Sequence, residues 1–160
     1  MKLITLFALS MSLLSVSAPA MAEPFEYVLR ADAHSKTCVA RHDGRTQAGR
    51  AVRVQFFALP NGRFVLQMMP EGLESNRIAR RPVIFSFEDT LKIDAKAMLH
   101  KGTYQVDLRT GDGSSDLLVG LVNRVRMETR FPDAPDDALI LYLEGVPQMI
   151  ERVLSCQEQL

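Results

Sequence analysis

The sequence predicts a mainly β (α+β) fold: a single antiparallel, β-sandwich-like domain with two short helices, one near residues 115–124 and one near residues 147–157. Three observations support this prediction. Most of the chain after residue 24 alternates apolar and polar residues with the period of two that is typical of strands. Turn residues separate these runs. Only two stretches change to helical spacing, so we expect about seven or eight strands.

The first 22 residues have the features of a secretory signal peptide. A basic start and an apolar run precede the small-residue end Ala20-Met21-Ala22, and we expect cleavage after Ala22. The apolar run is too short to cross a bilayer, which takes about 20 residues. Residues 23–160 are therefore expected to be one exported, periplasmic, β-rich domain with no transmembrane segment after cleavage.

The charge of the chain is balanced overall but unevenly distributed. Without the leader, 18 basic and 19 acidic side chains remain, and this balance argues against a nucleic-acid-binding protein. Residues 41–82 contain eight arginines and three acids, whereas residues 107–160 contain ten acids and five arginines. The split could create a dipolar surface that steers a charged partner. Mutual neutralisation inside the fold is the interpretation that we favour.

The N-terminal half is expected to begin with strands at residues 25–29 and 37–42, the second followed by a turn at Asp43-Gly44. The clearest unit is a hairpin of residues 52–59 and 64–68 around the turn Pro60-Asn61-Gly62. Its outer face is unusually apolar, which predicts a cover from other elements or from a partner. The apolar residues of this face are Phe57, Leu59, Val65 and Met69.

The middle of the chain opens with residues 73–82, which are expected to form a polar, arginine-rich connection. Strands follow at residues 83–87, 91–97 and 104–108, because each run alternates with period two. The alanines and lysines of the second run also favour a helix, but the strict alternation favours a strand. The turn His100-Lys101-Gly102 joins the last two of these strands into a hairpin.

The first helix is expected to start at Ser114 or Ser115, because either hydroxyl can accept hydrogen bonds from the free amides of a helix start. A strand at residues 125–131 and an acidic loop at residues 132–137 follow. These elements lead into the last unit of the chain.

Residues 138–156 are expected to form a buried strand, a tight turn and a short helix. Pro147 can open this helix, since a missing N–H does no harm in the first turn. Cys156 shares the inner face of the helix with Val153. An even number of cysteines in an exported chain favours a disulfide between Cys38 and Cys156. Its loop of more than a hundred residues predicts a stabilisation of roughly 4–5 kcal/mol in the chain-entropy model.

The sequence signals for catalytic and metal-binding groups are weaker than the signal for the disulfide. His34, Cys38 and His42 would share one face of a helix and could bind zinc or copper, but on a strand each four-residue step covers about 13 Å. Cys38 with His42 as its base is disfavoured as a nucleophile by the expected disulfide. Residues 110–116 lack the acidic spacing of a calcium loop. Five methionines are assigned to packing rather than to copper: Met68, Met69, Met98, Met127 and Met149. We predict no catalytic residue, no metal site and no cofactor.

The C-terminal third resembles the invasion-associated locus B family of exported bacterial proteins. The residues that carry the resemblance are the helix Asp116-Leu117-Leu118-Val119-Gly120-Leu121-Val122, the strand at residues 125–131, and Leu141-Tyr142-Leu143-Glu144-Gly145-Val146 before the last helix. The closing pattern is also similar to that of periplasmic accessory proteins of type VI secretion. The resemblance implies a β-sandwich-like periplasmic domain, associated with virulence, that has no known catalytic residues.

These observations predict a non-enzymatic periplasmic binding or accessory protein that acts through protein–protein contacts at the cell envelope. The expected contact residues are Phe57, Val65, Arg77, Arg80 and Arg81, with a solvated loop as the competing interpretation of the arginines. An inhibitor or immunity protein of an enzyme or toxin is one alternative, and a copper or zinc carrier is another. A hydrolase is the least favoured.

Overall fold

The computed structural model describes residues 25–88, 91–110 and 113–160, so the expected signal peptide lies outside the described residues. Neither helix of this part is long and apolar enough to cross a membrane. The elements follow one another as β1 (Val28–Asp32), β2 (Thr37–Arg45), β3 (Ala51–Ala58), β4 (Phe64–Pro70), β5 (Ala79–Phe87), β6 (Lys92–His100), β7 (Thr103–Asp107), α1 (Ser114–Asn123), β8 (Arg126–Phe131), β9 (Ala134–Tyr142) and α2 (Val146–Glu158).

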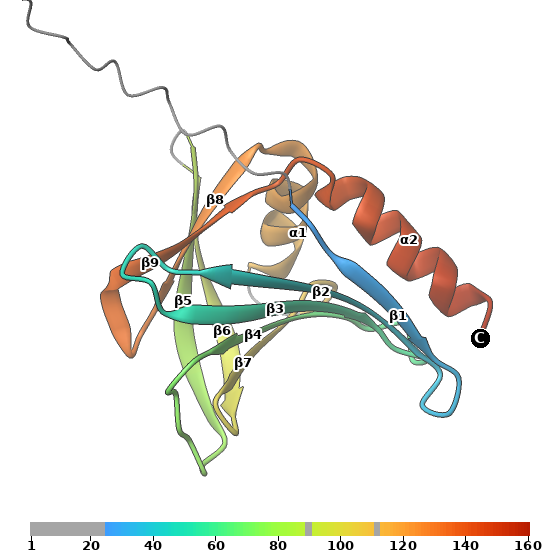
Figure 1. The fold of residues 1–160 in the computed structure, drawn as a ribbon, viewed down its shortest axis with the longest axis horizontal. Helices are drawn as coiled ribbons and strands as arrows, with labels where there is room; N and C mark the ends of the chain where they lie inside the picture. The colour runs from blue at the N-terminus through green and yellow to red at the C-terminus, as the bar shows by residue number, and fades with distance from the viewer. Residues whose placement is uncertain (1–24, 89–90, 111–112) are drawn as a thin grey trace, which may run out of the picture.

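The nine described strands form one antiparallel sheet in the order β1-β2-β3-β4-β7-β6-β5-β8-β9. The prediction of a mainly β, antiparallel fold with two helices is confirmed. This sheet is strongly bent, so that its two halves form the two layers of the fold. In Figure 1, β2 and β3 run across the direction of β5 and β6. The core lies between these halves.

The two halves of the sheet meet where the end of β2 lies beside β9. Thr46, directly after β2, forms an antiparallel bridge with Leu139 of β9. The backbone N–H of Gln47 donates to the carbonyl of Ala138 over 2.9 Å, and the N–H of Ala48 donates to the carboxylate of Asp137 over 2.9 Å. The first and last parts of the sheet are therefore joined, which holds the bend in place.

Helix α1 packs closely on the sheet through Leu117 and Leu121, which are both fully buried. Gly120 lies on the same face, against the ring of Phe87, where an added Cβ would overlap the ring. The helix begins at Ser114, but the predicted serine cap is wrong, because the residue at the N-cap position is Gly113 and no side chain caps the free amides.

Helix α2 packs on β1, β2 and β3, and Figure 1 shows it alongside β1. It begins at Val146 after Gly145, which has a left-handed φ of 86°, and its buried residues include Met149 and Val153. A disulfide joins Cys38 of β2 to Cys156 of α2 across 118 residues of sequence, with 6.0 Å between the two Cα atoms. The predicted disulfide is thus confirmed.

Several element boundaries in the N-terminal half differ from the predictions. The first strand begins at Val28, and Phe25 is instead a buried residue whose ring stacks on His42 with 4.4 Å between ring centroids. The predicted turn at Asp43-Gly44 is wrong, because β2 continues to Arg45. Pairing with β3 explains the continuation, since Asp43 accepts hydrogen bonds from Arg41 over 2.9 Å and from Arg53 over 3.1 Å.

Two predicted connections are shorter in the structure. β5 begins at Ala79, so Arg80 and Arg81 belong to a strand rather than to the connection expected at residues 73–82. β9 begins at Ala134 and takes up part of the acidic loop expected at residues 132–137. Both corrections follow from pairing with the neighbouring strand, since residues 79–86 pair with β6 and Ala134 pairs with Phe131 of β8.

Candidate functional site

Strands β6 and β7 diverge soon after the turn that joins them. The turn residues Lys101 and Gly102 both have positive φ, at 48° and 71°, as a two-residue type I′ hairpin requires. The two strands then pair only as far as Met98 and Gln105. Beyond this point β6 stays paired with β5, and β7 stays paired with β4. A wedge-shaped opening therefore forms between them.

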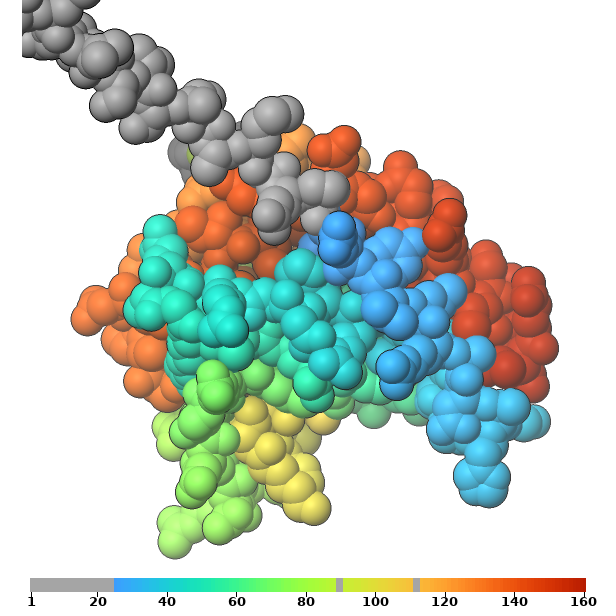
Figure 2. All heavy atoms as spheres, in the orientation of Figure 1, coloured from blue at the N-terminus to red at the C-terminus, as the bar shows by residue number. Residues whose placement is uncertain are grey.

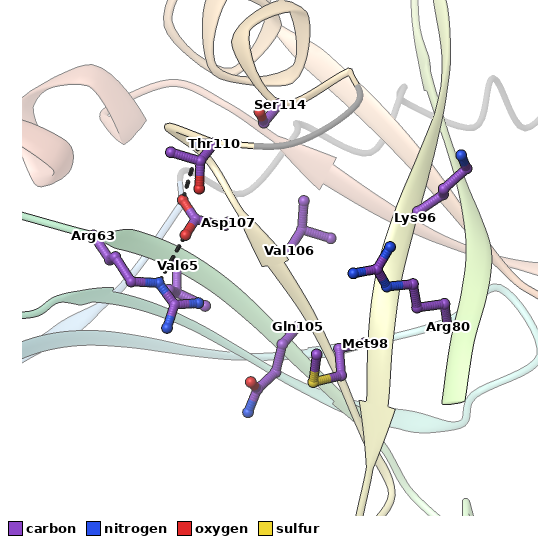
Figure 3. A pocket seen from close by; sticks show the side chains of 10 residues that line it. All are labelled: Arg63, Val65, Arg80, Lys96, Met98, Gln105, Val106, Asp107, Thr110 and Ser114. Atoms are coloured by element: carbon purple, nitrogen blue, oxygen red, sulfur yellow. Dashed lines mark hydrogen bonds and ion pairs between the residues drawn. The ribbon is translucent and has the colours of Figure 1, made fainter. Parts of the chain in front are cut away.

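This opening is a cleft of about 250 Å³, which we call the β6–β7 cleft. Met98 and Gln105 lie at the end where the strands converge, and Arg80 and Lys96 lie on the opposite side from Arg63 (Figure 3). The β6–β7 turn and the β4–β5 connection project from the body of the molecule (Figure 2). The residues that line the cleft are Arg63, Val65, Arg80, Lys96, Met98, Gln105, Val106, Asp107, Thr110 and Ser114.

Asp107 is held by hydrogen bonds within the cleft. The Nε of Arg63 donates to its Oδ2 over 2.8 Å, and the backbone N–H groups of Arg109 and Thr110 donate to its Oδ1 over 3.0 and 3.2 Å. Burial alone raises the pKa of this carboxyl, but the hydrogen bonds from Arg63, Arg109 and Thr110 outweigh burial and place the pKa below its ordinary value. Asp107 is therefore ionised at neutral pH, and its charge is matched by Arg63.

The remaining charge of the cleft is positive. Among the described residues that line it, three are basic and one is acidic. Arg63 and Asp107 neutralise each other, and Lys96 already has an interaction of its own, so Arg80 supplies the positive charge that no described residue matches. Arg80 makes no ion pair with any other described residue, and its cross-strand partner is the uncharged Met98. Positive charge between low-dielectric walls focuses the field and attracts anions. The arrangement can therefore bind an anionic group.

Two of the predicted contact residues, Val65 and Arg80, line this cleft together. Phe57 pairs with Val65 across β3 and β4 and is half-buried, and Val65 itself is 4% exposed. Arg77 is exposed on the connection between β4 and β5, outside the cleft. Arg81 is paired with the buried Ala97, so it lies on the opposite face of β5 from Arg80.

Arg63, Lys96 and Asp107 are not among the contact residues predicted from the sequence. Each is an ordinary polar residue of an alternating run, and nothing local marks where two strands part. One sequence signal points to Arg63, because it directly follows the turn Pro60-Asn61-Gly62, where a side chain stands at the end of a hairpin. The divergence itself follows from the pairing of β7 with β4, which is distant in sequence.

A second charged cluster fastens the turn between β8 and β9 to the other half of the sheet. The hydroxyl of Tyr104 donates to Oδ1 of Asp133 over 2.9 Å, and the Nη2 of Arg50 lies 2.6 Å from Oδ2. Burial raises the pKa of Tyr104, and the hydrogen bond to Asp133 adds to this rise, so the phenol stays protonated. Arg50–Asp133 and Arg63–Asp107 both join the basic segment to the acidic one, which supports mutual neutralisation inside the fold.

The candidate metal ligands are not brought together. Among the described residues, no group of three His, Cys, Asp or Glu side chains is placed to hold a metal ion. Cys38 is in the disulfide, and the Nδ1 of His42 lies 2.7 Å from the carbonyl oxygen of Glu26. Residues 111 and 112 of the calcium-like loop lie outside the described part of the chain. The methionines Met68, Met127 and Met149 are fully buried, which supports packing, whereas Met98 is 42% exposed, so its assignment to packing is wrong.

No family model and no curated protein sequence matches the chain. Among solved structures, the crystal structure of invasion associated protein B from Bartonella henselae superimposes with a TM-score of 0.55 over 87% of this chain and 99% of the other. The two proteins share a fold. Only 10% of their aligned residues are identical. The resemblance that the C-terminal third predicts is therefore supported at the level of architecture.

Proposed function

We propose that the chain is a non-enzymatic accessory protein of the cell envelope, exported to the periplasm, that acts by binding another protein. Its disulfide supports an oxidising compartment, where such bonds form and persist. The fold that it shares with invasion associated protein B supports an accessory role related to virulence.

The observation that carries the proposal is the chemistry of the β6–β7 cleft. A nucleophilic enzyme needs a hydroxyl or thiol within hydrogen-bond reach of a base, and a third group that orients the base. The ten residues that line the cleft include the hydroxyls of Thr110 and Ser114 but no histidine or cysteine. The acid of the cleft, Asp107, is already engaged by Arg63 and by two backbone amides. Such a site favours recognition of an anionic group rather than catalysis.

Cross-linking in the native envelope tests this proposal. The tagged protein would be expressed in its own host, cross-linked with formaldehyde before lysis, and purified under denaturing conditions. An unrelated exported protein with the same tag and the same expression level serves as the control. We expect one envelope or secreted protein to be enriched over the control. An equal set of proteins from both baits would contradict the proposal.

The same experiment separates the alternative of an inhibitor or immunity protein. Such a protein would form a stoichiometric complex with one enzyme or toxin, and adding the purified chain would abolish the activity of that enzyme. An accessory protein would leave the activity of its partner in place.

A further inference from the structure

We propose that the β6–β7 cleft binds the carboxylate of an acidic side chain that belongs to an extended segment of the partner protein. This inference rests on the proposed function, because it names the chemistry by which the partner is recognised. The side chain that would carry the recognition is Arg80, with Met98 as the apolar contact of the acidic side chain.

The charge of the cleft selects the ligand class. The ion pair between Arg63 and Asp107 is neutral as a unit, so the charge that a ligand can match is that of Arg80 on the other side of the cleft. A guanidinium offers several N–H donors in a planar fork that matches the two oxygens of a carboxylate. Arg80 has no ion pair with another described residue that a ligand would first have to break. The cleft is thus complementary to a carboxylate.

The size of the cleft favours a side chain over a whole small molecule. Pockets for small molecules are usually about 300–1,000 Å³, whereas this cleft is about 250 Å³. Glutamate combines a charged end with an apolar stem. Met98, the cross-strand neighbour of Arg80, is 42% exposed and provides apolar surface beside it. A glutamate side chain can therefore place its stem on this surface and its carboxylate beside Arg80.

The shape of the cleft favours an extended backbone. The cleft lies between two strands whose ladder stops at Met98 and Gln105, so the strand edges beyond this pair face the opening and not each other. An extended segment can lie along such edges and hydrogen-bond to them, as peptides do when they add to a sheet.

Nuclear magnetic resonance titration of the oxidised protein tests the inference with defined probes. The first probe is a short serine–glycine peptide with one central glutamate, acetylated and amidated at its ends, and the second carries glutamine in place of that glutamate. We expect the glutamate peptide to shift the amide signals of Met98, Gln105 and Asp107 saturably. The glutamine peptide should bind about tenfold more weakly, because a charged hydrogen bond is lost.

Two variants make the test specific. Arg80→Gln should weaken binding of the glutamate peptide by about tenfold, whereas Arg77→Gln removes a nearby arginine outside the cleft and should leave the affinity unchanged. Thermal unfolding of both variants verifies that each remains folded. Equal binding of the two peptides, or undiminished binding by the Arg80→Gln variant, would overturn the inference. Inorganic phosphate is a third probe, and binding of phosphate without binding of the glutamate peptide would also overturn it.

Failure of this inference can be distinguished from failure of the proposed function. If the wild-type chain and the Arg80→Gln variant capture the same envelope protein equally, and the peptide does not bind, the accessory role stands and the cleft is not its binding site. If the peptide binds at the cleft but no envelope protein is enriched, the carboxylate site stands and the accessory role fails.

Discussion

Removal of the disulfide is expected to cost a large part of the stability of the protein. The change is the double substitution Cys38→Ala and Cys156→Ala, which removes the bond and leaves no free thiol. The bond closes a loop across 118 residues of sequence. In the chain-entropy model, a cross-link that closes a loop of this length removes conformational entropy from the unfolded chain and raises its free energy by about 5 kcal/mol at 25 °C. Domains of this size have about 5–15 kcal/mol of stability in total.

Measured losses are often smaller than the entropy model predicts, because the unfolded chain retains some structure. We therefore expect the double variant to lose about 3–5 kcal/mol in the free energy of unfolding, measured by equilibrium urea unfolding monitored by circular dichroism. Cys38 is fully buried, so a small part of the loss will come from its missing sulfur atom rather than from the bond.

Reduction of the wild-type protein supplies the control that separates these two contributions. A strong reductant should lower the wild-type stability to nearly that of the double variant, and it should leave the variant itself unchanged. A loss below about 1 kcal/mol would refute the loop-entropy reasoning. Two titratable thiols in the native, untreated protein would refute the bond itself.

Three further predictions concern the sheet and the cleft. Gly102→Ala should destabilise the protein by about 2–4 kcal/mol, because Gly102 has a positive φ and the new Cβ would overlap a backbone carbonyl of the β4–β5 connection. Gly72 also has a positive φ but faces open space, so Gly72→Ala should cost only about 1–2 kcal/mol. Tyr104→Phe should cost about 1 kcal/mol in urea unfolding, since it removes the hydrogen bond to Asp133. Asp107 has a lowered pKa in the folded state, so its contribution is present above about pH 4 and is lost as the pH falls through the folded pKa. The stability difference between wild type and Asp107→Asn should therefore shrink in acid.

Each of these predictions has an outcome that would contradict it. Equal losses for the two glycine variants would mean that the close approach at Gly102 is unimportant. A Tyr104→Phe variant as stable as the wild type would show that water replaces the lost contact at no cost. A difference for Asp107→Asn that stays constant from neutral pH to acid would show that the carboxyl is not stabilised in its ionised form.

The parts of the fold that were predictable from sequence are those that depend on neighbouring residues. The hairpin of β3 and β4 is marked by alternation around Pro60-Asn61-Gly62, and both helices are marked by the spacing of their apolar residues. The disulfide was predictable because Cys156 and Cys38 are the two cysteines of the chain. Each of these signals is contained in a short stretch or in the cysteine count.

The cleft was only half predictable, because it depends on pairing between distant strands. Arg80 was a candidate contact, but its position in β5 depends on pairing with β6, which begins at Lys92. The same pairing sends Arg81 to the opposite face, which an arginine-rich segment interpreted as a loop does not indicate. Asp107 faces Arg63 only because β7 pairs with β4, and these two residues are 44 positions apart in the sequence.

The position of the disulfide also sets a timing for the maturation of the chain. Cys38 is made early, but its partner lies in α2, 118 residues later, so the bond cannot form until these residues have left the ribosome. During that interval the early thiol is open to wrong partners. A chain truncated before residue 156 lacks the native partner of this thiol. The bond therefore marks molecules in which α2 has been made and packed on the sheet, and a thiol-reactive reagent would distinguish them from the others.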